Sequence, residues 1–246
     1  MRAPPLRLLL LVVLLSVSCI HRPEERCDHC YVIDRVHPYL RPLKPNTRKL
    51  FVLVPGALGY GWEWDHAVDK LRSTPDVDFI VFWWNPWASL RRSAEELRDR
   101  MHTTFRQLPL SVTEIDIVAH SAAGLIAAHG VADLVVPSHV RTRLITIGAP
   151  FAGMMGPPMS LDDPLDSPFL IGLLGSFRDY PPSARDVEVI EYVTSARTDP
   201  VMARRWCHDA APVDIGPAGR RRILLGDELD HNFTVAHVID QLLAAP

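Results

Sequence analysis

Short apolar runs alternate with amphipathic stretches along most of the chain. The apolar runs are rich in β-forming residues and predict buried strands. They lie at residues 49–54, 79–84, 115–118, 143–147, 187–193 and 222–225. Apolar residues at helical spacing predict helices between and after them. These helices are expected over residues 94–108, 125–135 and 235–243. Such alternation is typical of a mostly parallel sheet with helices on both faces, so the pattern predicts an α/β fold.

A local signal marks the expected start of the first of these helices. Residues 93–96 read Ser-Ala-Glu-Glu, which has the form of a capping box. We therefore expect that helix to begin at Ser93.

Two segments interrupt the alternation. Residues 19–47 are rich in proline and charge without clear periodicity, which indicates a linker or an N-terminal wrap. Residues 151–185 are rich in Pro, Gly and Asp, with an apolar island at 169–174. A loop of this length in a compact domain is usually functional or mobile, so we expect a lid-like insertion. One domain is expected over residues 48–246, a length that can bury a sizeable core.

The N-terminal segment has the pattern of an export signal. Arg2 and Arg7 precede the apolar residues 8–15, and residues 16–18 offer a small-x-small cleavage site. The apolar part is too short to span a bilayer as a helix. We therefore expect residues 1–18 to be a signal peptide and the protein to be exported, either secreted or held at the cell envelope.

Cys19 follows this cleavage site directly. Residues 15–19 resemble the lipobox of bacterial lipoproteins, and that resemblance implies a lipidated Cys19 that anchors the chain to a membrane. Simple secretion is the alternative.

Three further cysteines are Cys27, Cys30 and Cys207. In an exported protein a disulfide is the commoner use of such residues, here from Cys27 or Cys30 to Cys207. A zinc site that also recruits His208 is the alternative.

The charge balance argues against a nucleic-acid partner. The formal net charge is −3, and no long basic block occurs. Binding to a phosphate backbone needs a basic patch or stripe, so we expect no nucleic-acid binding.

The most informative residues are 119–124, Ala-His-Ser-Ala-Ala-Gly. They follow an apolar strand and precede a helix, and small residues flank Ser121 on both sides. This is the sequence form of a nucleophile elbow, although alanines at 119 and 123 replace the usual glycines. An ordinary loop serine that caps the helix is the alternative.

A glycine-flanked turn follows the first strand at residues 52–59. Glycines let backbone N–H groups converge on one point, as an oxyanion hole requires. We expect the amides of Ala57 and Ala122 to be its two donors; a generic turn at a strand end is the alternative.

Together these motifs resemble α/β-hydrolases, in particular bacterial lipases and esterases. Residues 54–60 resemble the oxyanion loop of that family, residues 119–124 its elbow, and residues 146–153 a motif at a strand end. The resemblance covers roughly residues 48–243. It implies an α/β-hydrolase fold with a short lid-like insertion at 151–185.

The resemblance also implies the rest of a catalytic triad. The acid falls on Asp199, just past the fifth strand, with Asp209, Asp214 and Asp227 as alternatives. The base falls on His231, between the last strand and the last helix, with His237 as the weaker choice.

Other side chains are candidates for lining the site. Leu58 lies on the oxyanion loop, and His120 precedes the nucleophile, where it either packs or lines the pocket. Five tryptophans fall just after the first two strands, where open α/β sheets bind ligands; core packing is their alternative. They are Trp62, Trp64, Trp83, Trp84 and Trp87.

These features predict a serine hydrolase that cleaves carboxylic esters through an acyl-enzyme. The lid-like segment favours lipid or other hydrophobic acyl esters. Such a triad needs no metal or organic cofactor, so the expected partner is the ester substrate alone. An acyltransferase or thioesterase on the same triad is one alternative, and a non-catalytic binding protein of the same fold is another.

Overall fold

The computed structural model describes residues 43–56, 64–84, 90–132, 134–149, 187–193, 220–225 and 233–244. Several predictions concern residues outside these ranges. They are the signal peptide at 1–18, the segment 19–42, the four cysteines, the lid-like segment 151–185, and the site residues Ala57, Leu58, Asp199 and His231.

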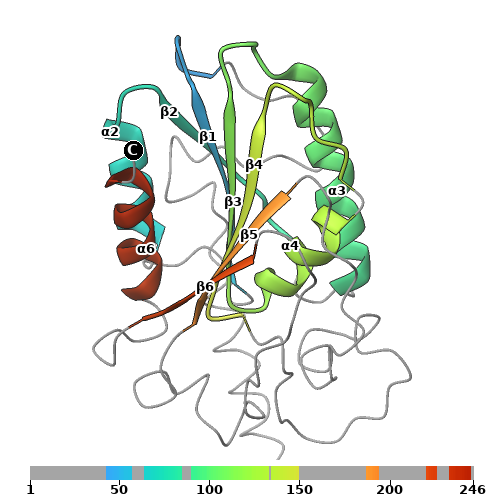
Figure 1. Ribbon diagram of the computed structural model, residues 1–246, viewed down its shortest axis with the longest axis vertical. Coiled ribbons are helices and arrows are strands. Elements are labelled where there is room, and N and C mark those ends of the chain that lie inside the picture. Colours follow the sequence, from blue (N-terminus) through green and yellow to red (C-terminus); the bar gives the residue numbers. More distant parts are fainter. Residues whose placement is uncertain are drawn as a thin grey trace, which may run out of the picture.

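A single parallel sheet forms the centre of the described structure (Figure 1). Its strands are β1 (Lys49–Val54), β2 (Val77–Val81), β3 (Glu114–His120), β4 (Arg141–Ile147), β5 (Val187–Val193) and β6 (Arg220–Leu224). Their order is β2-β1-β3-β4-β5-β6, and every neighbouring pair is parallel. The predicted parallel sheet is confirmed.

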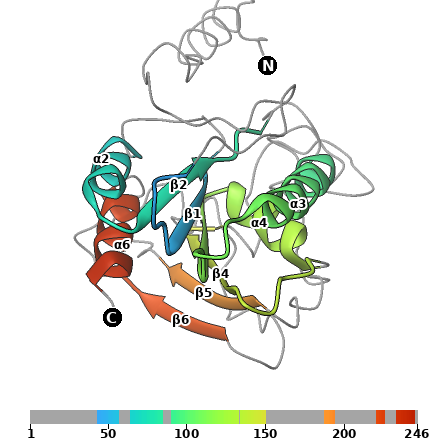
Figure 2. The ribbon, with the colours of Figure 1, turned by 90° about the horizontal axis from the view of Figure 1, so that it is seen from above.

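Helices cover both faces of the sheet. They are α2 (Asp65–Ser73), α3 (Leu90–Gln107), α4 (Ala123–Ala132) and α6 (Phe233–Ala244). Seen from above, α3 and α4 lie on one side of the sheet and α2 and α6 on the other (Figure 2). Because side chains alternate along a strand, β1 serves both layers: Val52 packs with the α3 and α4 layer, and Phe51 with the α2 and α6 layer.

The start of α3 differs from the prediction. The helix already includes Leu90, so the capping box at Ser93 is wrong. Ser93 is buried on the helix face that packs inward. The small side chains there allow α4 to approach closely, since a Cβ on Gly130 would lie 3.1 Å from the carbonyl oxygen of Ala94.

Two other elements differ from the sequence pattern. Helix α2 was not predicted, because only Ala67, Val68 and Leu71 are buried along its length. Strand β2 begins and ends earlier than expected, at Val77–Val81. Its bounds follow its pairing with β1, and the aromatic residues that continue the apolar run lie beyond the paired stretch.

The described residues before β1, from position 43 on, contact the body of the domain through Lys44. The Lys44 ammonium lies within 3.3 Å of four backbone carbonyls at the end of α2 and the start of β2. They belong to Leu71, Arg72, Thr74 and Val77. A cation at a helix C-terminus satisfies carbonyls that have no partner within the helix.

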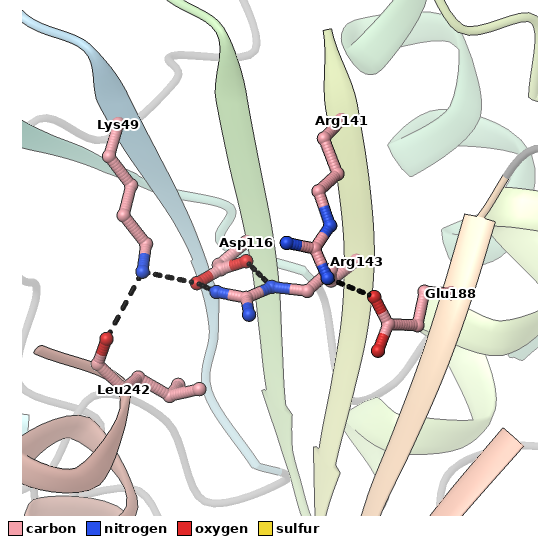
Figure 3. A network of polar contacts seen from close by, with 6 residues as sticks. All are labelled: Lys49, Asp116, Arg141, Arg143, Glu188 and Leu242. Atoms are coloured by element: carbon pink, nitrogen blue, oxygen red, sulfur yellow. Dashed lines mark hydrogen bonds and ion pairs between the residues drawn. The ribbon is translucent and has the colours of Figure 1, made fainter. Parts of the chain in front are cut away.

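A buried ion network joins three strands near their amino ends (Figure 3). Both carboxylate oxygens of Asp116 on β3 accept hydrogen bonds from the Arg143 guanidinium on β4, each at 2.6 Å. Lys49 on β1 lies 3.1 Å from Asp116 and donates to the carbonyl of Leu242 on α6 at 3.1 Å. The hydrogen bonds that Arg143 donates to Asp116 raise the pKa of Arg143 above its ordinary value. The network therefore joins the central strands to the last helix.

No helix in the described ranges is long and apolar enough to cross a membrane.

Candidate active site

The sheet has one point at which its connections diverge. From β1 the chain moves outward to β2, whereas β3 lies on the other side of β1 and leads on to β4. Open α/β sheets bind their ligands beyond the carboxyl ends of the strands at such a switch point. Here those carboxyl ends carry Gly56, two residues after β1, and Ser121, directly after β3.

Ser121 has a strained backbone. Its φ is 55°, in the left-handed region, which costs a residue with a Cβ about 1–2 kcal/mol. Two other non-glycine residues in the described ranges have positive φ, Asn46 and Asp76, and both are types that tolerate this conformation through local hydrogen bonds. Serine lacks that advantage, so its conformation is the one expected of a nucleophile elbow.

Backbone hydrogen bonds hold Ser121 in place. Its N–H donates to the carbonyl of Ile147 on β4 at 2.8 Å, and its carbonyl accepts from the N–H of Gly124 at 2.9 Å. The serine is half-buried, whereas Ala122 and Ala123 on the helix side are buried. The backbone of Ser121 is therefore held by both the sheet and the first residues of the helix.

Helix α4 begins at Ala123, two residues after the serine. The N–H of Leu125 donates to the carbonyl of Ala122 at 3.1 Å, so the first turn is tightly wound. The first N–H groups of a helix have no acceptor in a preceding turn and carry the positive end of the helix dipole. The amide of Ala122 lies at this end, a position that favours the binding of a negative charge.

The tight approach of strand and helix occurs at Gly124. A Cβ built on Gly124 would lie 2.4 Å from the Cβ of Ala149, a distance that real atoms do not adopt. Ala149 follows β4, next to Gly148, whose φ is 54°. The structure thus places the required glycine one residue after Ala123, and the alanines at 119 and 123 fit within the core.

Gly56 brings the loop after β1 against the elbow. A Cβ on Gly56 would lie 3.3 Å from the Cβ of Ser121 and 3.4 Å from Nδ1 of His120. Both contacts are tighter than most real ones, so a side chain at position 56 would push against Ser121 and His120. The described part of the predicted oxyanion loop therefore lies directly beside Ser121.

His120 is buried, with 3% of its surface exposed. Its ring lies close to Gly56. This position favours the packing alternative for His120, and a role in substrate binding stays a prediction.

The described tryptophans divide by burial. Trp64 and Trp84 are buried in the two core layers, as the packing alternative expects. Trp83 is partly exposed, and Trp62 and Trp87 lie outside the described ranges. The indole N–H of Trp84 donates to the carbonyl of Pro55 at 2.7 Å. No local pattern in the sequence indicates this bond, because it joins residues that follow two different strands.

The predicted acid and base lie outside the described residues. This holds for Asp199 and His231 and for the alternative acids Asp209, Asp214 and Asp227, so their roles stay predictions. The alternative base, His237, is exposed on α6, where its Nε2 lies 2.8 Å from Nε2 of Gln241. Within the described ranges, no three His, Cys, Asp or Glu residues gather in a way that could hold a metal ion.

Known structures share this architecture. The lipase BlEst2 from Bacillus licheniformis, in its mature form, has a TM-score of 0.55 and 12% identity over 83% of this chain and 96% of its own. Est1E from Butyrivibrio proteoclasticus has a TM-score of 0.52 and 12% identity, over 81% and 88%. YbtT, a type II thioesterase from the yersiniabactin pathway, has a TM-score of 0.55 and 13% identity, over 83% and 93%. No family model and no curated protein matches the sequence. At these identities the likeness is one of fold.

Proposed function

The chain has the α/β-hydrolase fold, and we propose that it is a serine hydrolase that cleaves carboxylic esters. The observation that carries the proposal is the conformation of Ser121. A serine with φ of 55° stands at the switch point of the sheet, between the end of β3 and the N-terminus of α4. Backbone strain of this kind is concentrated at functional sites, so it favours a functional role for the Ser121 hydroxyl.

The proposed reaction passes through an acyl-enzyme. The Ser121 hydroxyl attacks the ester carbonyl while His231 takes its proton, and Asp199 holds the imidazole in the required tautomer. His231 then gives the proton to the leaving alcohol. Water, activated by the same histidine, attacks the acyl group and releases the acid and the free serine.

The oxyanion of each tetrahedral intermediate is assigned to the amides of Ala57 and Ala122. The dipole of α4 supports this role for Ala122, since the negative charge develops next to the positive end of the helix. Gly56 supports it for Ala57, because the residue before Ala57 already lies against the elbow.

We propose that the acyl group is hydrophobic. The proposal rests on the apolar island at residues 169–174 within the lid-like segment. A panel of p-nitrophenyl esters of graded chain length tests it. A kcat/KM that rises with chain length and falls on deletion of residues 151–185 supports it; equal values for all chain lengths would overturn it.

Ester turnover by Ser121→Ala is the test of the function itself. We expect the variant to lose turnover by about 10⁴-fold or more, as expected when a triad loses its nucleophile. Ser73→Ala is the matched control, because Ser73 is exposed at the end of α2 and its hydroxyl only caps a carbonyl of its own helix. Turnover that survives Ser121→Ala unchanged would refute the proposal.

The acyl acceptor is tested by product analysis. Hydrolysis predicts the free acid as the product even when a short alcohol competes with water. A product that is mainly the new ester would identify an acyltransferase, and a strong preference for acyl thioesters over oxygen esters would identify a thioesterase.

A further inference from the structure

The indole of Trp84 occupies an unusual place in the ladder between β1 and β2. Leu53 pairs with Val81, and the N–H of Phe82 donates to the carbonyl of Leu53 at 2.8 Å. Since ladder bonds of parallel strands repeat every two residues, the next bond should join Trp84 to the carbonyl of Pro55. It does, but the donor is the indole N–H, at 2.7 Å.

This bond holds the peptide between Pro55 and Gly56, which belongs to the predicted oxyanion loop. Pro55 has a restricted φ and no N–H of its own, and its carbonyl is held on the β2 side by Trp84. All described peptide bonds are trans, so the N–H of Gly56 points to the opposite side, toward β3. The orientation of the peptide between Pro55 and Gly56 is therefore set by this bond.

The same peptide is confined on its other side by the elbow. In the register of β1 and β3, Val54 pairs with Ala119, so position 56 falls opposite Ser121. The 3.3 Å and 3.4 Å approaches of a Cβ on Gly56 to Ser121 and His120 show how little room remains there. Residues 55 and 56 of the loop thus lie between Trp84 on one side and the elbow on the other.

We infer that Trp84 is a positioning residue, which sets the oxyanion loop against Ser121 through its hydrogen bond to Pro55. The inference rests on the proposed function. Trp84 does not touch the substrate in this account: it is buried, with 2% of its surface exposed. Its contribution is preorganisation, because a donor that is already in place costs no rearrangement in the transition state.

Trp84→Phe tests the inference, because phenylalanine keeps an aromatic ring and lacks the N–H. We expect kcat for an ester to fall by about 10- to 100-fold, since a displaced oxyanion donor loses part of what its complete removal would lose. We expect KM to change less than about twofold, because the donor acts mainly in the transition state.

The chain offers a matched control in Trp64→Phe. Trp64 is fully buried, and within the described structure its indole nitrogen has no hydrogen-bond partner. The same atoms are removed from the core, but no hydrogen bond is lost. A purely structural role for Trp84 predicts that both variants lower the melting temperature and that both keep the kcat of the wild type. Such a result would overturn the inference.

Hydrogen exchange gives a readout that does not depend on turnover. Peptides that cover residues 50–60 should exchange faster in Trp84→Phe than in the wild type and in Trp64→Phe. If the wild type hydrolyses no ester and reacts with no fluorophosphonate, the proposed function fails. Separately, equal exchange rates in Trp84→Phe and the wild type would overturn the anchoring of the loop by Trp84. Faster exchange in Trp84→Phe with an unchanged kcat would overturn the inferred effect of Trp84 on catalysis.

Discussion

Among single residues, two backbone positions with opposite requirements for a side chain shape the candidate site. Ser121 has a side chain where φ favours glycine, and Gly124 lacks one where a Cβ would collide with Ala149. The strain at Ser121 presents the hydroxyl, and the gap at Gly124 lets the helix start close to the sheet. Each can be tested by a single substitution.

Ser121→Gly should be more stable than Ser121→Ala by about 1 kcal/mol, because only glycine relieves the strain of positive φ. Chemical denaturation of the two inactive variants measures the difference directly. The control is Ser73, which lies in the last turn of α2. There the sign should reverse, with glycine less stable than alanine, since φ is helical. Equal stability of the two Ser121 variants would show that the elbow is not strained.

Gly124→Ala should lower the free energy of unfolding by about 1–3 kcal/mol, because the new methyl group overlaps Ala149. Ala149→Gly removes the atom that it meets, so the double variant should recover most of the loss. A double-mutant cycle by urea denaturation measures the coupling. Additive losses of stability would mean that contact with Ala149 does not cause the effect of Gly124→Ala.

The sequence reveals Ser121 but not Gly124, for a physical reason. The elbow is a local pattern of small residues between a strand and a helix, and it can be recognised within the hexapeptide at 119–124. The partner of Gly124 is Ala149, which the fold brings close from the end of β4. The bond between Trp84 and Pro55 likewise depends on the register of two strands.

At the scale of the element, the strands were predictable because they are buried on both faces and therefore apolar throughout. Helices were less predictable where little of their surface is buried. Helix α2 buries three side chains, and Lys44, which lies outside the helix, donates to two carbonyls at its C-terminus. The failed capping box at Ser93 has another cause: in sequence, a serine buried within a helix looks the same as one that caps the helix.

Lys44→Met should lower the free energy of unfolding by about 1.5–3 kcal/mol, the range for hydrogen bonds to a charged group. The variant keeps an unbranched side chain and removes the donor to the carbonyls at the end of α2. Lys70→Met is the control. Lys70 and Asp240 form an exposed pair between α2 and α6, and their bond lowers the pKa of Asp240. An exposed pair contributes about 0–1 kcal/mol. Equal losses in both variants would contradict this role for Lys44.

In the molecule as a whole, the buried ion network and the proposed active site lie at opposite ends of the sheet. The buried ion network of Lys49, Asp116 and Arg143 lies near the amino ends of the strands (Figure 3). Ser121 follows the carboxyl end of β3. The two ends are joined by the rigid strands, so a change in the network should alter folding without altering the site.

Asp116→Ala should cost about 3–5 kcal/mol of stability, because it leaves the Arg143 guanidinium buried without its counter-charge. Ester turnover per folded molecule should remain that of the wild type. Glu188→Ala is the control: its partner Arg141 is 59% exposed, so the loss should stay below about 1 kcal/mol. Urea denaturation and turnover at low temperature measure both quantities. A loss of kcat in the folded variant would contradict the separation.

The central claim is that Ser121 is a nucleophile, and its most direct test is covalent labelling. The wild type is incubated with a fluorophosphonate, and the adduct is located by tandem mass spectrometry. We expect one adduct per chain, on Ser121, and no adduct in Ser121→Ala. An unlabelled wild type, or an adduct on another residue of an enzyme that turns over esters, would contradict it.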